Sequence, residues 1–273
     1  MSASRPGLAR TVDVTRAFDQ HAESYDRMVS ANHSYHEHLR LSARRMGLPN
    51  QGRGLRLLDL GCGTGASTAA LLDAAPEAEE IIAVDASERM LAQAKRKNWP
   101  SRVRFVHADV LDLMRADIHG PFDGILAAYL LRNLPDPDVG LQRFYELLRP
   151  GAPLAIHEYS VRDSFAARLR WTAVCWGVII PMAKLRTGSA EIYRYLWRSV
   201  HQFDGVRRLA DRMRAAGFVD IRLQTVGGWQ QHIVHTLLGR RPPLGPVERE
   251  VESDEGEQST SDEDGSASGS ATS

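Results

Sequence analysis

A strand-like apolar run that ends in alternating glycines carries the clearest chemical signal in the chain. The run LLDLGCGTGAST contains Asp59, followed by Gly61, Gly63 and Gly65. Glycine has no Cβ atom, so these positions permit a tight turn and a close approach of the backbone to a ligand. The spacing is ambiguous for a dinucleotide fingerprint, because Ala66 stands where that pattern places its third glycine or an alanine. By itself the run predicts either a ligand-binding turn or a purely structural one.

Two acidic residues follow at the ends of the next two predicted strands. Asp85 comes 20 residues after Gly65, where a carboxylate can accept both hydroxyl protons of a ribose. Asp109, followed by Val110, suits the exocyclic amine and the ring face of an adenine. Each acid alone is typical of a residue that caps the start of a helix. Two of them at successive strand ends after a glycine turn favour a nucleoside pocket.

A second chemical signal is the pair Arg132-Asn133, which follows the fourth predicted strand. Open α/β sheets bind ligands at the carboxyl ends of their strands, so this pair is placed to meet a substrate. The histidines do not indicate a metal site. His33, His36 and His38 would not share one face of a helix, and we predict no metal.

Alternating strands and helices must position these residues. Short apolar strands with helical crossovers predict a parallel sheet that is covered on both faces. A later strand pair, separated by Gly227-Gly228, predicts an antiparallel hairpin at one edge. The expected fold is α/β and doubly wound, with a mostly parallel, seven-stranded sheet. The strands are expected at 55–60, 81–85, 103–108, 122–126, 152–158, 219–226 and 229–237, and helices at 67–75, 87–97 and 139–148.

Composition divides the chain into three parts. Residues 13–240 are expected to form one domain, 1–12 a flexible N-terminus and 241–273 a disordered acidic tail. Nine acidic residues and one basic residue follow Gly245, while 33 basic and 25 acidic residues precede Pro246. The domain should therefore prefer anionic partners. Two cysteines exclude a disulfide framework, and no apolar run is long enough to span a bilayer, so the cytoplasm is the expected compartment.

The glycine run and the segment AVDASERML that holds Asp85 resemble the first two motifs of the class I S-adenosylmethionine-dependent methyltransferases. The resemblance implies a Rossmann-like methyltransferase fold with S-adenosylmethionine as the cofactor. S-adenosylmethionine has no pyrophosphate, so a glycine path without a phosphate nest suffices. By the resemblance, the cofactor site consists of Asp59, Gly61, Gly63, Gly65, Thr68, Asp85, Ala86, Asp109, Val110 and Ala128.

A more specific resemblance is to the ubiquinone/menaquinone biosynthesis C-methyltransferase family, over roughly residues 17–238. Its matching segments, in chain order, are Tyr25-Asp26, the Arg132-Asn133 run, 148–151, Glu158-Tyr159-Ser160, 188–196, 216–218 and 227–232. The chain departs from the family where Ala128 and Leu130 replace glycines beside the Arg-Asn pair. The resemblance implies C-methylation of a prenylated quinol ring, most simply demethylmenaquinol to menaquinol. The Asn/Asp-Pro-Pro-aromatic signature of base-modifying methyltransferases is missing, so no nucleic acid partner is expected.

The same resemblance implies the catalytic roles. Arg132 does not deprotonate appreciably, so it would polarise a water or stabilise a developing phenolate. Asn133 and Tyr25 would position the ring, and Tyr129 and His232 would contact the substrate. His157 is a further candidate, although only His232 matches a family position. The alternative is that Arg132 pairs with Asp136 or Asp138 and that Asn133 caps a turn.

The most apolar run, residues 171–183, is too short to span a membrane. It predicts a buried or lid helix, or an entry for a prenyl tail on the bilayer face. Its basic flanks are Arg162, Arg168, Arg170, Lys184 and Arg186, which suit peripheral contact with anionic headgroups at the inner face of the plasma membrane. Two other functions stay open: an O- or N-methyltransferase of another small hydrophobic metabolite, and a cofactor-binding protein without catalysis. The oligomeric state cannot be predicted.

Overall fold

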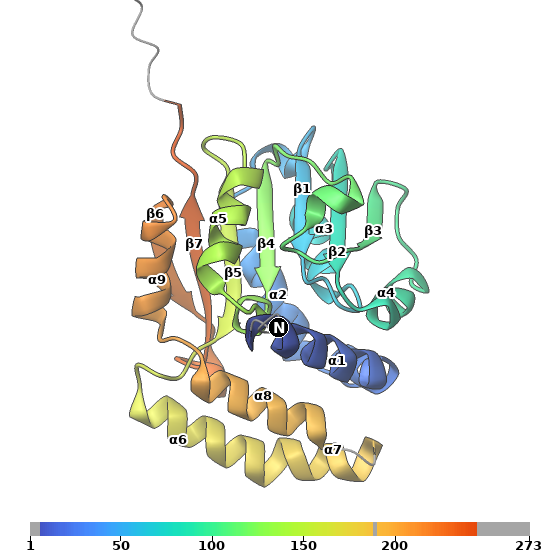
Figure 1. Cartoon of the computed structure of the whole chain (residues 1–273), viewed down its shortest axis with the longest axis vertical. Helices are drawn as coiled ribbons and strands as arrows, with labels where there is room; N and C mark the ends of the chain where they lie inside the picture. The colour runs from blue at the N-terminus through green and yellow to red at the C-terminus, as the bar shows by residue number, and fades with distance from the viewer. Residues whose placement is uncertain (1–5, 188–189, 245–273) are drawn as a thin grey trace, which may run out of the picture. The chain divides into compact units, whose positions relative to one another are not determined.

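The computed structural model describes residues 6–187 and 190–244 and contains a seven-stranded sheet in the order β3-β2-β1-β4-β5-β7-β6 (Figure 1). The pairs from β3 to β5 are parallel, and β7 is antiparallel to both of its neighbours. The predicted α/β, mostly parallel fold with an antiparallel edge is confirmed. The strands are β1 Arg56–Leu60, β2 Glu80–Asp85, β3 Val103–His107, β4 Gly124–Ala128, β5 Pro153–Tyr159, β6 Val219–Thr225 and β7 Val234–Arg240.

Helices cover both faces of the sheet because successive strand residues point to opposite sides. In β1, Leu57 belongs to the core cluster that includes residues of α2 and α3, while Leu58 belongs to the cluster that includes residues of α5 and α9. The central strand β4 is buried along its whole length, as expected for a strand covered twice. The helices are α1 Pro6–Ser30, α2 His33–Arg45, α3 Ala66–Ala74, α4 Glu88–Lys95, α5 Pro137–Leu147, α6 Phe165–Val174, α7 Ile180–Thr187, α8 Glu191–Gln202 and α9 Val206–Ala215.

A separate group of helices lies beyond the carboxyl ends of the parallel strands. Figure 1 shows α1 crossing this edge, with α8 next to it and α6 and α7 on the far side of α8. A single π-helical turn, Cys175–Ile179, joins α6 to α7. The predicted helix over the apolar run 171–183 is thus present as part of this group. In the part of the chain that the structure describes, no helix is long and apolar enough to cross a membrane.

Two predicted strand positions were wrong. The fourth strand was expected at 122–126 but begins at Gly124, because Phe122 instead makes an isolated bridge to Leu148. The last strand was expected at 229–237 but begins at Val234. A tight hairpin at Gly227-Gly228 does not form, because residues 228–230 make a short 3-10 turn that buries Gln230.

Several predicted features lie partly or wholly outside the described residues. Helix α1 begins at Pro6, inside the stretch 1–12 that the sequence predicts as flexible, and residues 1–5 are not described. Of the predicted acidic tail, only Arg241 to Leu244 are described. Gly188 and Ser189, which begin one of the family-like segments, also lie outside.

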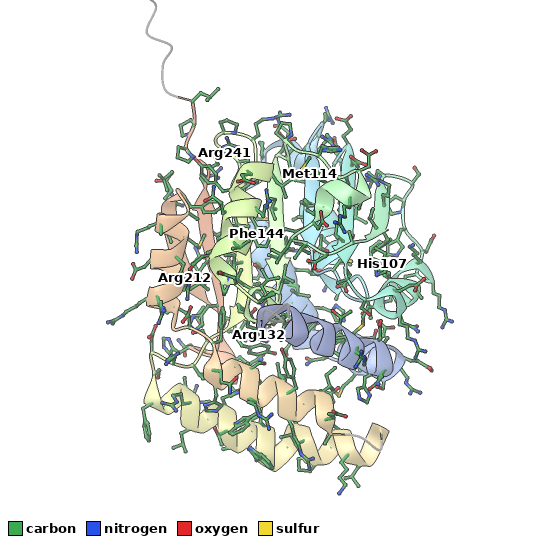
Figure 2. All side chains as sticks on the ribbon, viewed as in Figure 1. His107, Met114, Arg132, Phe144, Arg212 and Arg241 are labelled. Atoms are coloured by element: carbon green, nitrogen blue, oxygen red, sulfur yellow. The ribbon has the colours of Figure 1, made fainter. Side chains whose placement is uncertain are left out.

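The packing of α5 on the sheet gives a first prediction. Phe144 is completely buried between α5 and the sheet (Figure 2), so Phe144→Ala should lower the free energy of unfolding by about 3–5 kcal/mol. Val139 lies on the same helix but is 47% exposed, and Val139→Ala should cost less than about 1 kcal/mol. Urea unfolding followed by circular dichroism measures both. Equal losses in the two variants would contradict the assigned packing of α5.

Candidate active site

Two adjoining cavities lie at the carboxyl edge of the sheet. The first is bordered by the glycine loop after β1 and by the ends of β2, β3 and β4. The second has a volume of about 390 Å³ and lies among α1, α2 and the α6–α8 group, which is in the size range of small-molecule sites. Six residues border both cavities, and they mark where two ligands would meet: Phe18, Tyr25, Val29, Tyr35, Tyr129 and Arg132.

The glycine loop presents bare backbone to the first cavity. Gly61 and Gly63 have φ values of 72° and 54°, a region that favours glycine. A Cβ atom at Gly63 would meet no atom within 4 Å, so the space beside it is open to a ligand. At Gly61 a Cβ atom would lie 3.0 Å from Leu130, the residue that replaces a family glycine. The Leu130 side chain therefore narrows the first cavity beside Gly61.

Asp59 supports this loop from below and does not reach the cavity. Its Oδ2 atom accepts hydrogen bonds from the hydroxyls of Ser67 and Thr68, at 2.8 and 2.7 Å. Burial raises the pKa of Asp59 to about 7, although the two hydroxyls oppose that rise. This contact fixes the start of α3 against β1 and so holds the shape of the loop.

Asp85 faces the first cavity from the end of β2. Its two oxygens accept hydrogen bonds from the backbone N–H groups of Gly63 and Ser87, each at 2.8 Å. Burial raises the pKa of Asp85, and these two hydrogen bonds limit the rise. Each oxygen keeps a further lone pair for a hydroxyl donor, so the carboxylate suits the two hydroxyls of a ribose.

Helix α1 is tied across the first cavity by two polar contacts. Asp19 accepts a hydrogen bond of 2.5 Å from the hydroxyl of Ser87, the N-cap residue of α4. Lys97 Nζ donates to Asp26 and to the carbonyl of Thr64 in the glycine loop, each at 2.7 Å. These contacts bring Phe18 and Tyr25 of α1 over the cavity.

Arg132 and Glu158 form a buried ion pair between the short helix after β4 and the end of β5. Their side chains are 5% and 1% exposed, and Arg132 Nη1 contacts Glu158 Oε1. Burial is the largest single effect and lowers the pKa of Arg132, but the charge of Glu158, together with Tyr195, Tyr159 and the Glu158 hydrogen bond, raises it overall. Arg132 (Figure 2) is therefore a permanent cation on the border of both cavities, and Glu158 is its buried partner.

The backbone carbonyl of Tyr129 joins this pair to Asn133. It accepts hydrogen bonds from Arg132 Nη1 and Asn133 Nδ2, each at 3.0 Å. Asn133 Oδ1 in turn accepts from the Tyr195 hydroxyl at 2.9 Å, which connects the site to α8. The alternative pairing of Arg132 was wrong, because Asp138 pairs with Arg212 and Asp136 caps α5.

The structure brings most of the predicted site residues together. The cavity-lining ones are Tyr25, Gly61, Gly63, Asp85, Ala86, Asp109, Val110, Ala128, Tyr129, Arg132 and Asn133. Three predicted cofactor residues do not border either cavity: Asp59 and Thr68 face each other beneath the loop, and Gly65 approaches Trp99. His232 is exposed on the connection before β7 and also borders neither cavity. His157 is fully buried inside the sheet.

Sequence reasoning predicted Tyr25 of α1 but missed the other contributions of α1 and those of α2 and α8. Four apolar residues of α1 are spaced at intervals of four, three and four, which places them on one face of the helix: Phe18, Ala22, Tyr25 and Val29. That pattern could have revealed the helix over the site. Glu158 was noted only as part of a family-like segment, and nothing in its sequence neighbourhood identifies Arg132 as its partner.

The second cavity is mostly apolar and aromatic. The α6–α8 group contributes Trp171, Ile179, Met182, Ile192, Tyr193 and Leu196, and Met28 and Val29 come from α1. Its polar lining includes Arg132, several tyrosines, Asn32, His33, Ser34 and Gln230. An apolar cavity with a few convergent polar groups suits a largely hydrophobic ligand that carries oxygen atoms at one end.

Comparisons with known proteins agree with this geometry. The model of the ubiE/COQ5 methyltransferase family matches residues 8–236. A demethylmenaquinone methyltransferase of Clavibacter sepedonicus is 33% identical over 210 residues, which are 76% of this chain and 83% of that protein. One of Anoxybacillus flavithermus is 30% identical over 232 residues, which are 83% of this chain and 97% of that protein.

Solved structures show the same fold at lower sequence identity. The 1,6-didemethyltoxoflavin-N1-methyltransferase of Burkholderia thailandensis has a TM-score of 0.57 and 19% identity, and the match covers 89% of this chain and 93% of that one. A phosphoethanolamine N-methyltransferase of Haemonchus contortus has a TM-score of 0.57 and 18% identity, over 85% of this chain and 59% of that one.

The buried carboxyl of Asp59 predicts a pH effect on stability. Its folded pKa of about 7 lies above the ordinary value of 3.8, so between these values only the folded state keeps the proton. The free energy of unfolding contributed by Asp59 should therefore fall as the pH rises from about 4 to about 7. Relative to Asp59→Asn, the unfolding equilibrium constant of the wild type should increase by more than about tenfold over that range. Urea unfolding at several pH values measures this difference, and parallel pH profiles would contradict it.

Proposed function

This chain belongs to the ubiE/COQ5 methyltransferase family, and we propose that it methylates a ring carbon of a prenylated quinol, with demethylmenaquinol as the substrate. It is an S-adenosylmethionine-dependent methyltransferase by family and fold. The observation that carries the substrate proposal is the position of Arg132. This buried cation lies where the cofactor-like cavity meets a larger apolar cavity.

The residues of the first cavity fit S-adenosylmethionine. The open space beside Gly63 suits the methionine part, and the Asp85 carboxylate suits the ribose hydroxyls. Asp109 and Val110, at the end of β3, suit the adenine amine and ring. The bound cofactor would supply an electrophilic methyl group on a sulfonium.

The second cavity would hold the quinol with its ring toward the six shared residues and its tail among α6, α7 and α8. A quinol carbon next to a hydroxyl becomes a stronger nucleophile as that hydroxyl gives up its proton. The phenolic pKa is about 10, so the neutral form dominates at pH 7. A fixed cation at Arg132 stabilises the developing phenolate, and it needs little reorganisation because Glu158 already holds it.

The reaction balances without a metal or a covalent intermediate. The bound cofactor would supply the methyl group and keep the electron pair of the broken sulfur–methyl bond, while the ring carbon would gain the methyl group and give up its hydrogen as a proton to water. Tyr25 borders both cavities and would orient a ring oxygen by a hydrogen bond, and Asn133, which borders the first cavity and is bonded to Tyr129 and Tyr195, would contribute its remaining amide N–H. Holding the carbon and the methyl group in line supplies the remaining rate enhancement.

We further propose that the α6–α7 face docks on an anionic membrane surface, because a prenylated substrate resides in the bilayer. This face consists of five exposed apolar side chains: Phe165, Leu169, Trp176, Val178 and Leu185. Arg162, Arg168, Arg170 and Lys184 are exposed among them, and Asp163 is the one acidic residue between 161 and 187. Trp171, Ile179 and Met182 of the same segment line the second cavity, so a lipid tail could pass from this face into it.

The quinol proposal predicts a turnover that depends on the ring oxidation state and on Arg132. Labelled S-adenosylmethionine and a short-chain demethylmenaquinol should give methylated product only under reducing conditions, because the quinone lacks the activating hydroxyl. Arg132→Ala should reduce kcat by at least about 100-fold, the scale of losing one preorganised charge partner of the transition state. Arg143→Ala removes an exposed arginine paired with Glu146 and serves as the control. Cofactor binding without any quinol turnover in the wild type would instead favour another small hydrophobic substrate, methylated on oxygen or nitrogen.

The membrane proposal predicts salt-sensitive binding to vesicles that contain phosphatidylglycerol and weaker binding to pure phosphatidylcholine. The double variant Leu169→Ser/Leu185→Ser removes two side chains that are 61% and 87% exposed, and it should bind at least about tenfold more weakly. Met114→Ser is the matched control, because Met114 is 72% exposed but lies away from the α6–α7 face (Figure 2). Co-sedimentation measures all three proteins. Undiminished binding of the double variant would rule out this face.

A further inference from the structure

A column of buried polar side chains crosses the sheet and ends at the second cavity. Arg45 of α2 donates a hydrogen bond from Nη1 to the Thr236 hydroxyl oxygen at 3.0 Å, and that oxygen lies 3.2 Å from His157 Nδ1. His157 Nε2 lies 3.1 Å from the Tyr129 hydroxyl. Thr236 and His157 are completely buried and face each other across β7 and β5. The methyl-transfer chemistry proposed above uses none of the first three residues.

The donor and acceptor capacities of these groups determine which group donates each hydrogen bond along the column. Arginine only donates, so the Thr236 oxygen accepts from Arg45. Within the described part of the chain, the Thr236 hydroxyl has two polar partners, Arg45 and His157, so its own proton points to His157 Nδ1. Burial lowers the pKa of His157 to about 3, and the neutral ring therefore carries its single proton on Nε2, facing the oxygen of Tyr129.

Tyr159 is the next group after Tyr129. The two rings stack with centroids 4.8 Å apart. Burial raises the pKa of Tyr159 to about 12, while Arg132 and a hydrogen bond from Tyr129 hold it lower. Because the Tyr129 oxygen already accepts the His157 Nε2 proton, the proton of Tyr129 itself is left for the hydroxyl oxygen of the stacked Tyr159. The Tyr159 proton is then left for a group inside the second cavity, which Tyr159 borders.

We propose that the column Arg45–Thr236–His157–Tyr129 positions the Tyr159 hydroxyl so that it donates a hydrogen bond to an oxygen of the substrate ring. The proposal rests on the proposed function for the nature of the substrate. Tyr159 is then a substrate-binding residue, and His157 is a positioning residue that acts through Tyr129. The fixed direction makes the site favour a ring that presents an oxygen acceptor at this point.

The column also helps to hold the unusual backbone conformation of Tyr129. Tyr129 is a non-glycine residue with a φ of 55°, a conformation that costs about 1–2 kcal/mol. Its ring is held between Tyr35 and Tyr159, and its hydroxyl is held by His157. Its carbonyl positions Arg132 and Asn133, so the column supports both sides of the ring site.

Two measurements test the proposal, and the first needs no substrate. Long-range proton–nitrogen NMR of protein labelled with nitrogen-15 in histidine reports the tautomer of each imidazole, and the His157→Gln spectrum assigns the His157 signals. We expect the proton on Nε2. A proton on Nδ1 would reverse the direction of the hydrogen bonds along the column and overturn the proposal, whether or not the enzyme methylates a quinol.

The second measurement uses the short-chain quinol assay. Tyr159→Phe keeps the stacked ring and should raise KM about tenfold, the effect of one lost hydrogen bond, with the cofactor Kd unchanged. His157→Leu should show a similar loss, His157→Gln should largely restore activity, and His157→Leu should cause little further loss in the Tyr159→Phe background. Melting temperatures of all variants report folding separately. Independent, multiplying losses, or no effect of Tyr159→Phe, would overturn the proposal, while a wild type that turns over no quinol would count against the proposed function alone.

Discussion

The site depends on one buried ion pair, Arg132 with Glu158. Both side chains are almost completely inaccessible to water, and an unpaired charge in either position would cost several kcal/mol. The pair therefore fixes the short helix after β4 against the end of β5, at the place where the two cavities meet. The carbonyl of Tyr129 extends this constraint to Asn133, and Asn133 extends it to α8. A buried pair of this kind contributes little net stability compared with apolar side chains, which argues that its value lies in the cation it presents to the cavities.

The two halves of the site have different origins in the sequence. The proposed cofactor half consists of backbone at the end of β1 and of two carboxylates, Asp85 and Asp109, near the ends of β2 and β3, so its chemistry follows from glycine positions and strand ends. The substrate half is made by helices packed on that edge, above all α1, α6 and α8. Solved methyltransferases of similar fold are named for different substrates, as expected when the function depends on the site and not on the fold.

The sequence predicted the sheet well because each parallel strand is an apolar run closed by Gly, Asp or Pro. It failed where no such pattern exists. The two glycines at 227–228 indicated a tight hairpin, but the chain there makes a longer connection whose path depends on burying Gln230. Thr68 was predicted to touch the cofactor, and it turns instead to Asp59, because a buried carboxylate needs donors. The partnership of Arg132 with Glu158 joins residues 26 positions apart, and only the parallel pairing of β4 with β5 brings them together.

The most direct test of this account replaces the ion pair with apolar residues of similar size, Arg132→Met together with Glu158→Leu. Such replacements of a buried pair are commonly neutral or stabilising. The account predicts a double variant that unfolds at the wild-type temperature or above and binds S-adenosylmethionine with unchanged affinity, yet transfers methyl to the quinol at least about 100-fold more slowly. A double variant with near wild-type turnover would show that the pair only fastens the fold, and it would contradict the assignment of Arg132 to the chemistry.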